Sequence, residues 1–327
     1  MDLKKKEIDI FLSRNFLNKE EIVPIESDAS FRKYYRVKNK KLLIMYAPKA
    51  KGESVSKFRN IDEKLISAGI SAPIIYDYDE KNDFMLIEDF GEDIFSKIID
   101  KECEEELYKK AISLLANIYS FSIEKKISLA SLDDYSSNVL IDESNLFIEW
   151  YLRQHLGILL SEKSAFAFKE IIKNLFYQLK LSQKVLVLRD YHVDNLIHLK
   201  DRENIKQVGI IDFQDALIGS PAYDIASLVE DVRRPISIRL ENKLKEYYAL
   251  LTEINLQELD FDTSFFSIQR NLKILGIFSR LKYRDKKESY MKYIENAWRF
   301  INFHIEKPEF IELREWIEIH LKKNGNY

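Results

Sequence analysis

Residues 185–199 read VLVLRDYHVDNLIHL, and after a polar gap residues 208–216 read VGIIDFQDA. Each stretch opens with an apolar, β-prone run that ends on an aspartate, Asp190 in the first and Asp212 in the second. Asn195 follows Asp190 by five residues. The repetition predicts two adjacent strand ends whose polar side chains face one point. The alternative is an ordinary hairpin in which Asn195 is a turn residue.

The spacing of these residues matches the needs of phosphoryl transfer. In protein kinases an H-R-D-x-x-x-x-N loop supplies the base and one metal ligand, and a D-F-G segment supplies another. Here Leu188-Arg189-Asp190 and Asn195 keep that spacing with Leu in place of His, and Asp212-Phe213-Gln214 replaces D-F-G. We therefore predict Asp190 as the catalytic base and Asn195 and Asp212 as ligands of Mg²⁺, with ATP as donor. His192 is a less favoured alternative base.

Composition and length are typical of an intracellular enzyme. The 327 residues are 46% hydrophobic, enough for one large or two moderate domains. A net charge of -3 gives no reason to expect nucleic acid or a membrane as partner. The lone Cys103 cannot form an internal disulfide, and no apolar run is long enough for a signal peptide or a membrane span. We expect a cytoplasmic protein.

The pattern of apolar residues divides the chain near residue 90. Before it, one helix is expected around Val55–Ile66, within a small sheet of five strands at most. Four of those strands are expected at Phe31–Val37, Lys41–Tyr46, Ile74–Tyr78 and Phe84–Ile87.

Beyond Gly91 the pattern becomes helical. Leu107, Ala111, Leu114, Leu115 and Ile118 have the spacing of one helix face, and the chain after Ile236 is almost entirely helix-like. The VLVL and GIID runs interrupt these helices as an isolated strand pair. We predict an α+β, two-lobed, protein-kinase-like fold. Residues 1–90 would be a β-rich nucleotide-binding lobe, and residues 91–327 a larger helical lobe with the catalytic hairpin and the acceptor site.

The expected nucleotide site departs from the protein-kinase pattern. The loop Ser27–Phe31 takes the place of a glycine-rich loop, and the third strand, Leu42–Tyr46, lacks the usual lysine. Arg32 or Lys33 could supply the missing cation, and Glu63 is a possible acidic partner on the helix. The absent lysine also leaves open a non-catalytic, nucleotide-binding pseudokinase. The residues expected to bind nucleotide, including the hinge at 88–91, are Ala29, Ser30, Phe31, Arg32, Met45, Glu88 and Phe90.

Longer phrases along the chain resemble the aminoglycoside phosphotransferase and choline kinase superfamily. The likeness is strongest to bacterial sugar kinases of cell-wall recycling, and it spans nearly the whole chain in order. The phrases are DASFRKYYRV (28–37), LIEDFG (86–91), EWYL (149–152), LRDYHVDN (188–195), IDFQDA (211–216), GSPAYD (219–224) and QRNLKILG (269–276).

This resemblance implies an acceptor and further site residues. It implies a kinase for the anomeric hydroxyl of N-acetylmuramate or N-acetylglucosamine, with GTP as a possible second donor. It also implies that Asp224 supports the catalytic loop, for which a helix N-cap is the alternative. Trp150 would stack on a sugar ring and Arg153 would meet a carboxylate, whereas a core aromatic and a solvated arginine are their structural alternatives. An amino alcohol or an aminoglycoside is the alternative acceptor.

Overall fold

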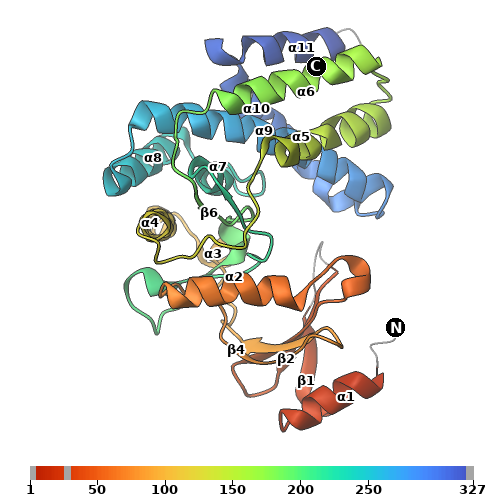
Figure 1. Ribbon diagram of the computed structural model, residues 1–327, viewed down its shortest axis with the longest axis vertical. Helices are drawn as coiled ribbons and strands as arrows, with labels where there is room; N and C mark the ends of the chain where they lie inside the picture. The colour runs from red at the N-terminus through yellow and green to blue at the C-terminus, as the bar shows by residue number, and fades with distance from the viewer. Residues whose placement is uncertain (1–4, 26–30, 322–327) are drawn as a thin grey trace. The chain divides into compact units, whose positions relative to one another are not determined.

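The computed structural model describes residues 5–25 and 31–321 (Figure 1). By packing, the chain forms two compact units. The first comprises residues 1–114, 124–128 and 193–216, and the second comprises residues 115–123, 129–192 and 217–327. The predicted division into a nucleotide-binding lobe (1–90) and a lobe with the acceptor site (91–327) is defined by ligand binding, and it stays a prediction. Within the two described ranges, no helix has both the length and the hydropathy needed to cross a membrane.

The first unit contains a five-stranded antiparallel sheet, which confirms the predicted strands to within two residues. The order is β1-β2-β3-β5-β4, so β4 lies at an edge. Lys33 pairs with Tyr46 and Leu42 with Glu88, which sets the register of the central strands. The bounds are β1 Ile22–Ile25, β2 Lys33–Val37, β3 Leu42–Tyr46, β4 Ile75–Asp79 and β5 Phe84–Glu88.

The prediction of one helix before residue 90 is wrong, because the described residues of this segment form two α-helices. Helix α2 (Val55–Ser67) is the expected one, and α1 (Lys5–Arg14) was missed behind its lysine-rich start. Ile8, Phe11 and Leu12 of α1 lie on one helix face and pack on the sheet beside Phe84. The remaining helical segments of this unit are η1 Lys19–Glu21, η2 Lys49–Lys51, α3 Phe95–Ile98, η4 Val193–Asn195, η5 Asn204–Gln207 and the first part of α4 (Glu104–Ile123).

The isolated strand pair expected from the VLVL and GIID runs is not formed. Instead, β8 (Val208–Ile210) pairs with β7 (Leu196–His198) in the first unit. In the second unit, β6 (Val185–Val187) pairs with β9 (Leu217–Gly219). The physical reason is proximity along the chain: β7 and β8 are consecutive antiparallel strands, which join most readily as a hairpin.

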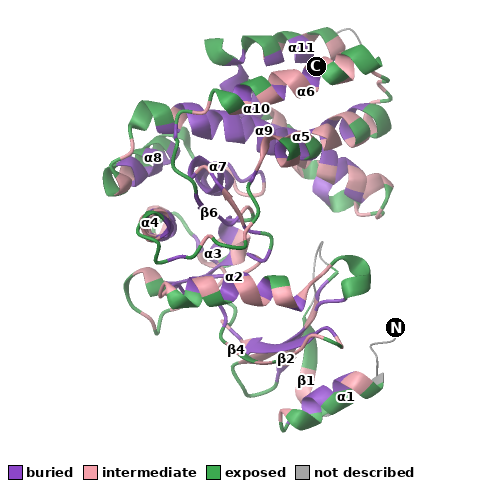
Figure 2. Cartoon of the chain, viewed as in Figure 1, coloured by how far each residue is buried: buried purple, intermediate pink, exposed green. Residues whose placement is uncertain are grey.

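The second unit is helical, as predicted, and α9 (Leu256–Tyr283) is its central element. Helix α9 contacts α5 (Ser137–Leu146), α7 (Ala222–Val229) and α10 (Ile294–Ile305), and α7 is buried throughout (Figure 2). Gly276 permits close packing, since a Cβ there would lie 2.3 Å from the carbonyl carbon of Leu146. The other helices are η3 Phe147–His155, α6 Glu162–Tyr177, α8 Ile238–Thr252, η6 Glu288–Tyr293, η7 Pro308–Phe310 and α11 Ile311–Leu321.

Candidate active site

The predicted site residues fall into two groups, one in each compact unit. Asp190 and Asp224 belong to the second unit, whereas Asn195 and Asp212 belong to the first. Asp190 and Asn195 are nevertheless only five residues apart in the chain. The boundary between the units therefore runs through the catalytic-loop motif.

Buried hydrogen bonds hold the backbone just before Asp190. The Asp224 carboxylate accepts the backbone N–H of Leu188 at 2.6 Å and that of Arg189 at 2.9 Å. Arg189 has a φ of 70°, in the left-handed region that non-glycine residues rarely adopt. The N-cap alternative for Asp224 is wrong, because Pro221 caps α7 and Asp224 lies inside the first turn of that helix. Asp224 thus fixes the local backbone conformation that precedes Asp190.

The environment of Asp224 favours its neutral form more than water does. Only 3% of the residue is exposed. This burial raises the pKa of Asp224 to about 7, although the two backbone N–H groups and Arg270 act in the opposite direction. The hydrogen bonds favour the carboxylate, so the support of the loop depends on pH in the neutral range.

The side chain of Arg189 ends in a buried charge cluster formed by Glu143, Lys273 and Tyr135. Glu143 of α5 pairs with Arg189 and accepts a hydrogen bond from the Lys273 ammonium group at 2.7 Å. The Tyr135 hydroxyl donates to the other Glu143 oxygen. Burial alone would raise the pKa of Glu143, but the charges of Lys273 and Arg189 outweigh it and lower the pKa to about 2. This anion therefore ties the loop before Asp190 to α5 and α9.

Sequence reasoning missed the importance of Glu143. It lies in the polar segment IDESN (141–145), which matches no motif. Its role depends on Arg189 and Lys273, which are 46 and 130 residues away along the chain. A charge partner at such a separation leaves no local signal.

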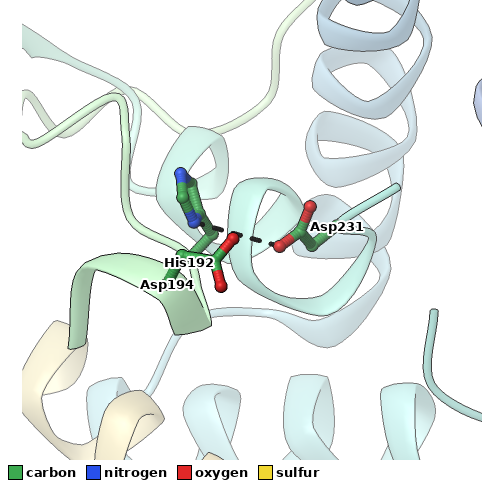
Figure 3. A group of neighbouring side chains, drawn as sticks. All are labelled: His192, Asp194 and Asp231. Atoms are coloured by element: carbon green, nitrogen blue, oxygen red, sulfur yellow. Dashed lines mark ion pairs between the residues drawn. The ribbon is translucent and has the colours of Figure 1, made fainter. Parts of the chain in front are cut away.

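His192, the alternative base, lies beside an acid of its own unit (Figure 3). Its Nδ1 is 3.9 Å from Oδ2 of Asp231, and both residues are buried. Asp231 also accepts a hydrogen bond from Arg233 at 3.2 Å, the local ion pair that residue spacing favours. The surroundings of His192 are those of a packed loop residue, so they do not favour it over Asp190.

The β7–β8 hairpin brings Asn195 and Asp212 to one end. Leu196 pairs with Ile210, and the N–H of Ile211 donates to the Asn195 carbonyl at 3.1 Å. Asp212 is the next residue, and its φ of 63° turns the chain out of the strand direction. The shared end follows from the register of two antiparallel strands.

The cation that holds Asp212 belongs to the same unit but lies 180 residues earlier in the chain. Arg32, which precedes β2, forms an ion pair with Asp212 through Nη2. Arg32 Nε lies 3.4 Å from Oε2 of Glu53, and the Gln214 amide donates to Asp212 at 3.0 Å. Arg32 is therefore the cation next to the predicted metal ligand, on a chain whose third strand lacks a lysine.

The acidic partner expected for this cation was assigned to the wrong glutamate. Glu63 faces away and pairs with Arg59 at 3.5 Å, whereas Glu53, just before α2, lies beside Arg32. Helix α2 still contacts the hairpin, because Phe58 packs on Phe213 with ring centroids 4.8 Å apart.

The donor atoms at the hairpin end fit a magnesium ion. Mg²⁺ prefers oxygen ligands, commonly one or two protein groups together with substrate phosphates. Asn195 offers an amide oxygen and Asp212 a carboxylate whose side chain is 35% exposed and so within reach of a ligand. One Asp212 oxygen is already bonded to Arg32 and Gln214, so metal binding would change these contacts.

The other residues expected to bind nucleotide are found in differing surroundings. Met45 is fully buried within the sheet, and Phe31 is half exposed with the Lys51 ammonium group 5.5 Å from its ring centroid. Glu88 accepts a hydrogen bond from Arg202 at 2.5 Å, and a Cβ on Gly209 would meet the ring of Phe90. Arg202 also lies over that ring. Ala29 and Ser30 lie outside the described residues.

The two residues expected to bind the acceptor lie on a π-helix, η3. Trp150 is half-buried and Arg153 is exposed. Hydrogen bonds of a π-helix join residues five apart, so two residues that are three apart do not have the spacing of one helix face. Their neighbour Tyr151 is a core residue, whose hydroxyl accepts a hydrogen bond from the Trp298 indole at 2.8 Å.

Comparison with known proteins identifies the family. Residues 21–261 match the model of the phosphotransferase enzyme family. The N-acetylmuramate/N-acetylglucosamine kinase of Pseudomonas putida is 31% identical, over 89% of this chain and 86% of the relative. That of Pseudomonas aeruginosa is 30% identical, over 90% and 87% respectively.

Solved structures agree at the level of the fold. The ADP-bound aminoglycoside phosphotransferase APH(2″)-Ib has a TM-score of 0.64 and 14% identity, over 94% of this chain and 99% of that one. Choline kinase LicA from Streptococcus pneumoniae has a TM-score of 0.62 and 15% identity, over 92% and 98%. These likenesses confirm the predicted kinase-like fold. The chain belongs to the phosphotransferase enzyme family.

Proposed function

We propose that the protein is an ATP-dependent sugar kinase acting on the anomeric hydroxyl of N-acetylmuramate or N-acetylglucosamine, as part of cell-wall recycling. The choice of a sugar as acceptor rests on the similarity to the two Pseudomonas kinases over about nine-tenths of this chain. The kinase-like spacing of Asp190, Asn195 and Asp212 supports phosphoryl transfer as the reaction.

In the proposed mechanism Asp190 accepts the proton of the sugar hydroxyl. The hydroxyl oxygen then attacks the γ-phosphorus of ATP in line, while the bond to the β-phosphate oxygen breaks. The support of Leu188 and Arg189 by Asp224 favours a fixed position for Asp190. Such positioning supplies much of the rate in this chemistry.

Asn195 and Asp212 would hold Mg²⁺, which when bound neutralises charge on the nucleotide phosphates. When nucleotide binds, Arg32 would give up part of its contact with Asp212 and bind the phosphates instead. It would thereby take the role of the missing strand lysine, and Glu53 would be its acidic partner. This role for Arg32 removes the main argument for a pseudokinase. The remaining predicted nucleotide and acceptor residues, among them Trp150 and Arg153, stay predictions.

Phosphate transfer to a panel of acceptors tests the proposal. Labelled ATP is offered with N-acetylmuramate, N-acetylglucosamine, choline and an aminoglycoside. Phosphorylation of the anomeric hydroxyl removes the reducing end, so loss of reducing sugar should match label transfer one to one. Transfer to choline or to the aminoglycoside alone would support the alternative acceptors.

Asp190→Asn tests the catalytic base. The variant should lower kcat by about a hundredfold or more, because it removes proton acceptance while keeping the shape of the side chain. Asp194→Asn in the same loop is the matched control and should keep most of the activity. Unchanged turnover of folded Asp190→Asn would contradict the mechanism.

A further inference from the structure

An aspartate occupies an apolar position on α2 in the first unit. Asp62 lies among Phe58, Ile61 and Leu65 on the buried side of this amphipathic helix and is only 1% exposed. Within residues 5–25 and 31–321, its Oδ1 has no hydrogen-bond partner. An unpaired carboxyl in such surroundings costs folding free energy, so its presence calls for a role.

This carboxyl lines a groove of about 490 Å³ between α2 and the edge strand β4, a size typical of sites for small molecules. Helix α2 contacts β4, and the outer side of α2 carries exposed and half-buried positions (Figure 2). The helix contributes residues at 59, 62, 63, 66 and 67, which is the spacing of a single face. The strand side contributes residues 74–78.

The walls of the groove are apolar and exposed. Ile66, Ile74, Tyr76 and Tyr78 are all among the exposed large hydrophobic residues of the chain, at 40–54% exposure. Such a concentration of exposed apolar side chains around a hollow is typical of a binding surface.

The charges of the groove favour a cation. Its lining includes the acids Asp62, Glu63 and Asp77 and one base, Arg59. Arg59 is already engaged, since its guanidinium lies 4.5 Å from the ring centroid of Tyr78 and pairs with Glu63 at 3.5 Å. Asp77 is paired with Arg14 at 2.7 Å. Among the described residues, Asp62 is therefore the lining acid that has no ion pair with a cation.

We propose that this groove is a second binding site, which takes a primary ammonium group attached to an apolar or aromatic body, with the Asp62 carboxylate as its counter-ion. The body would pack against Ile66, Tyr76 and Tyr78, and the ammonium group would pair with the Asp62 carboxylate.

The site has a physical connection to the predicted metal ligand. Phe58 lies one turn before Asp62 on α2, and its ring packs on that of Phe213, which follows Asp212. A ligand that orders α2 would therefore act on the residue next to Asp212. This second part rests on the proposed kinase function, whereas binding to the groove does not.

Calorimetric titration of the full chain with phenethylamine tests the binding itself. The neutral isostere 2-phenylethanol has the same aromatic body but no charge. The amine should bind with one-to-one stoichiometry, and about tenfold or more tighter than the alcohol, since only the amine pairs with a buried carboxylate. Equal affinity of the two probes, or no measurable binding of the amine, would overturn the proposal.

Asp62→Asn keeps the shape of the side chain and removes the negative charge. It should abolish the preference for the amine over the alcohol. Asp77→Asn removes a charge from the same groove and is the matched control, because that carboxylate already has a partner. An unchanged amine affinity in Asp62→Asn, or an equal loss in Asp77→Asn, would contradict the assigned counter-ion. Tyr76→Ala provides a second variant at an exposed position, and it should weaken binding of both probes.

Proton release gives an independent signature. Burial, together with the nearby charges of Glu63 and Glu88, raises the pKa of Asp62 to about 8. Pairing with an ammonium group at pH 7 should therefore release a proton, detected as a binding heat that varies with the ionisation enthalpy of the buffer. The groups facing Asp62 in the groove are Arg59, Glu63 and Asp77, and the Asp77→Asn control should leave this signal intact. A heat independent of the buffer would contradict ionisation of Asp62.

The link to catalysis is measured separately, as the change in KM for ATP at saturating phenethylamine. A change that disappears in Asp62→Asn would support the link, and no change would overturn it while leaving the binding site in place. If the protein phosphorylates none of the acceptors, the calorimetric result still stands.

Discussion

Two strand ends carry the predicted catalytic groups, and they are supported in opposite ways. Before Asp190, buried acids hold the chain: Asp224 binds two backbone N–H groups, and Glu143 binds the Arg189 side chain. At the end of β8 the acid Asp212 is itself the supported group, and the cation Arg32 holds it.

The difference separates a fixed support from an exchangeable one. Asp224 binds the loop backbone before Asp190, and Glu143 binds Arg189 and Lys273, so these contacts lie within the folded second unit. Arg32, in contrast, occupies an Asp212 oxygen that a metal ion would also use. We therefore expect the Asp190 side to be preorganised, and the Asp212 side to rearrange when nucleotide binds.

The largest effect is expected on breaking the fixed support with Glu143→Gln. The change leaves the buried cations Arg189 and Lys273 without their shared anion, so the free energy of unfolding should fall by about 3 kcal/mol or more. Glu149→Gln on the neighbouring exposed surface should change it by less than about 0.5 kcal/mol. Denaturant unfolding of both variants measures the difference, and equal small effects would show that the cluster is dispensable.

The same variant should alter the acid limb of stability. The folded-state pKa of Glu143, about 2, lies below its ordinary value of 4.5, so its stabilising contribution is present above about pH 4.5 and is lost as the pH falls toward 2. Unfolding free energy measured between pH 2 and pH 5 should therefore decline less steeply in Glu143→Gln than in the wild type.

Asp224→Asn tests the backbone part of the fixed support. An amide oxygen can replace one of the two accepted hydrogen bonds but lacks the negative charge, so kcat should fall by about tenfold to a hundredfold. KM for the sugar should change little, because Asp224 is buried and contacts the loop backbone. Asp285→Asn, at an exposed ion pair, is the control. A rise in KM with unchanged kcat would assign Asp224 to binding instead.

Arg32→Met tests the exchangeable support. If Arg32 replaces the strand lysine, KM for ATP should rise by about tenfold, which corresponds to one charge-assisted contact. The Mg²⁺ concentration for half-maximal activity should not rise in parallel, because the variant frees an Asp212 oxygen. Lys33→Met removes the other candidate cation and should leave KM nearly unchanged. A larger rise in KM for ATP in Lys33→Met than in Arg32→Met would assign phosphate binding to Lys33 instead.

Asp62 is a carboxyl with neither kind of support among the described residues, and its variant tests the pH dependence of stability. Its folded pKa of about 8 lies above the ordinary value of 3.8, so folding binds a proton between these values. The free energy of unfolding should consequently fall as the pH rises from about 4 to about 8. Asp62→Asn should remove this slope, and a slope that persists in the variant would assign it to other groups.

Local sequence signals predicted much of the fold and part of the site. Alternating and helical spacing located four sheet strands, helix α2 and the face of α4. Helix α1 was missed because its first residues are charged, and the apolar spacing of its three core residues was not recognised after them. The pairing of β6 with β9 was missed because short apolar runs do not indicate which strand they join.

By itself, the sequence placed Asn195 and Asp212 next to short apolar runs and predicted that their polar side chains face one point, whereas the β7–β8 hairpin that joins them is seen in the structure. The polar turn between two short apolar runs sets the antiparallel register, and the register sets the shared end. Only the tertiary structure decided which charges hold these groups. Arg32 meets Asp212 across 180 residues and Lys273 meets Glu143 across 130. Such ion pairs depend on how folded elements dock, and a chain pattern read over one helix or strand contains no information about that docking.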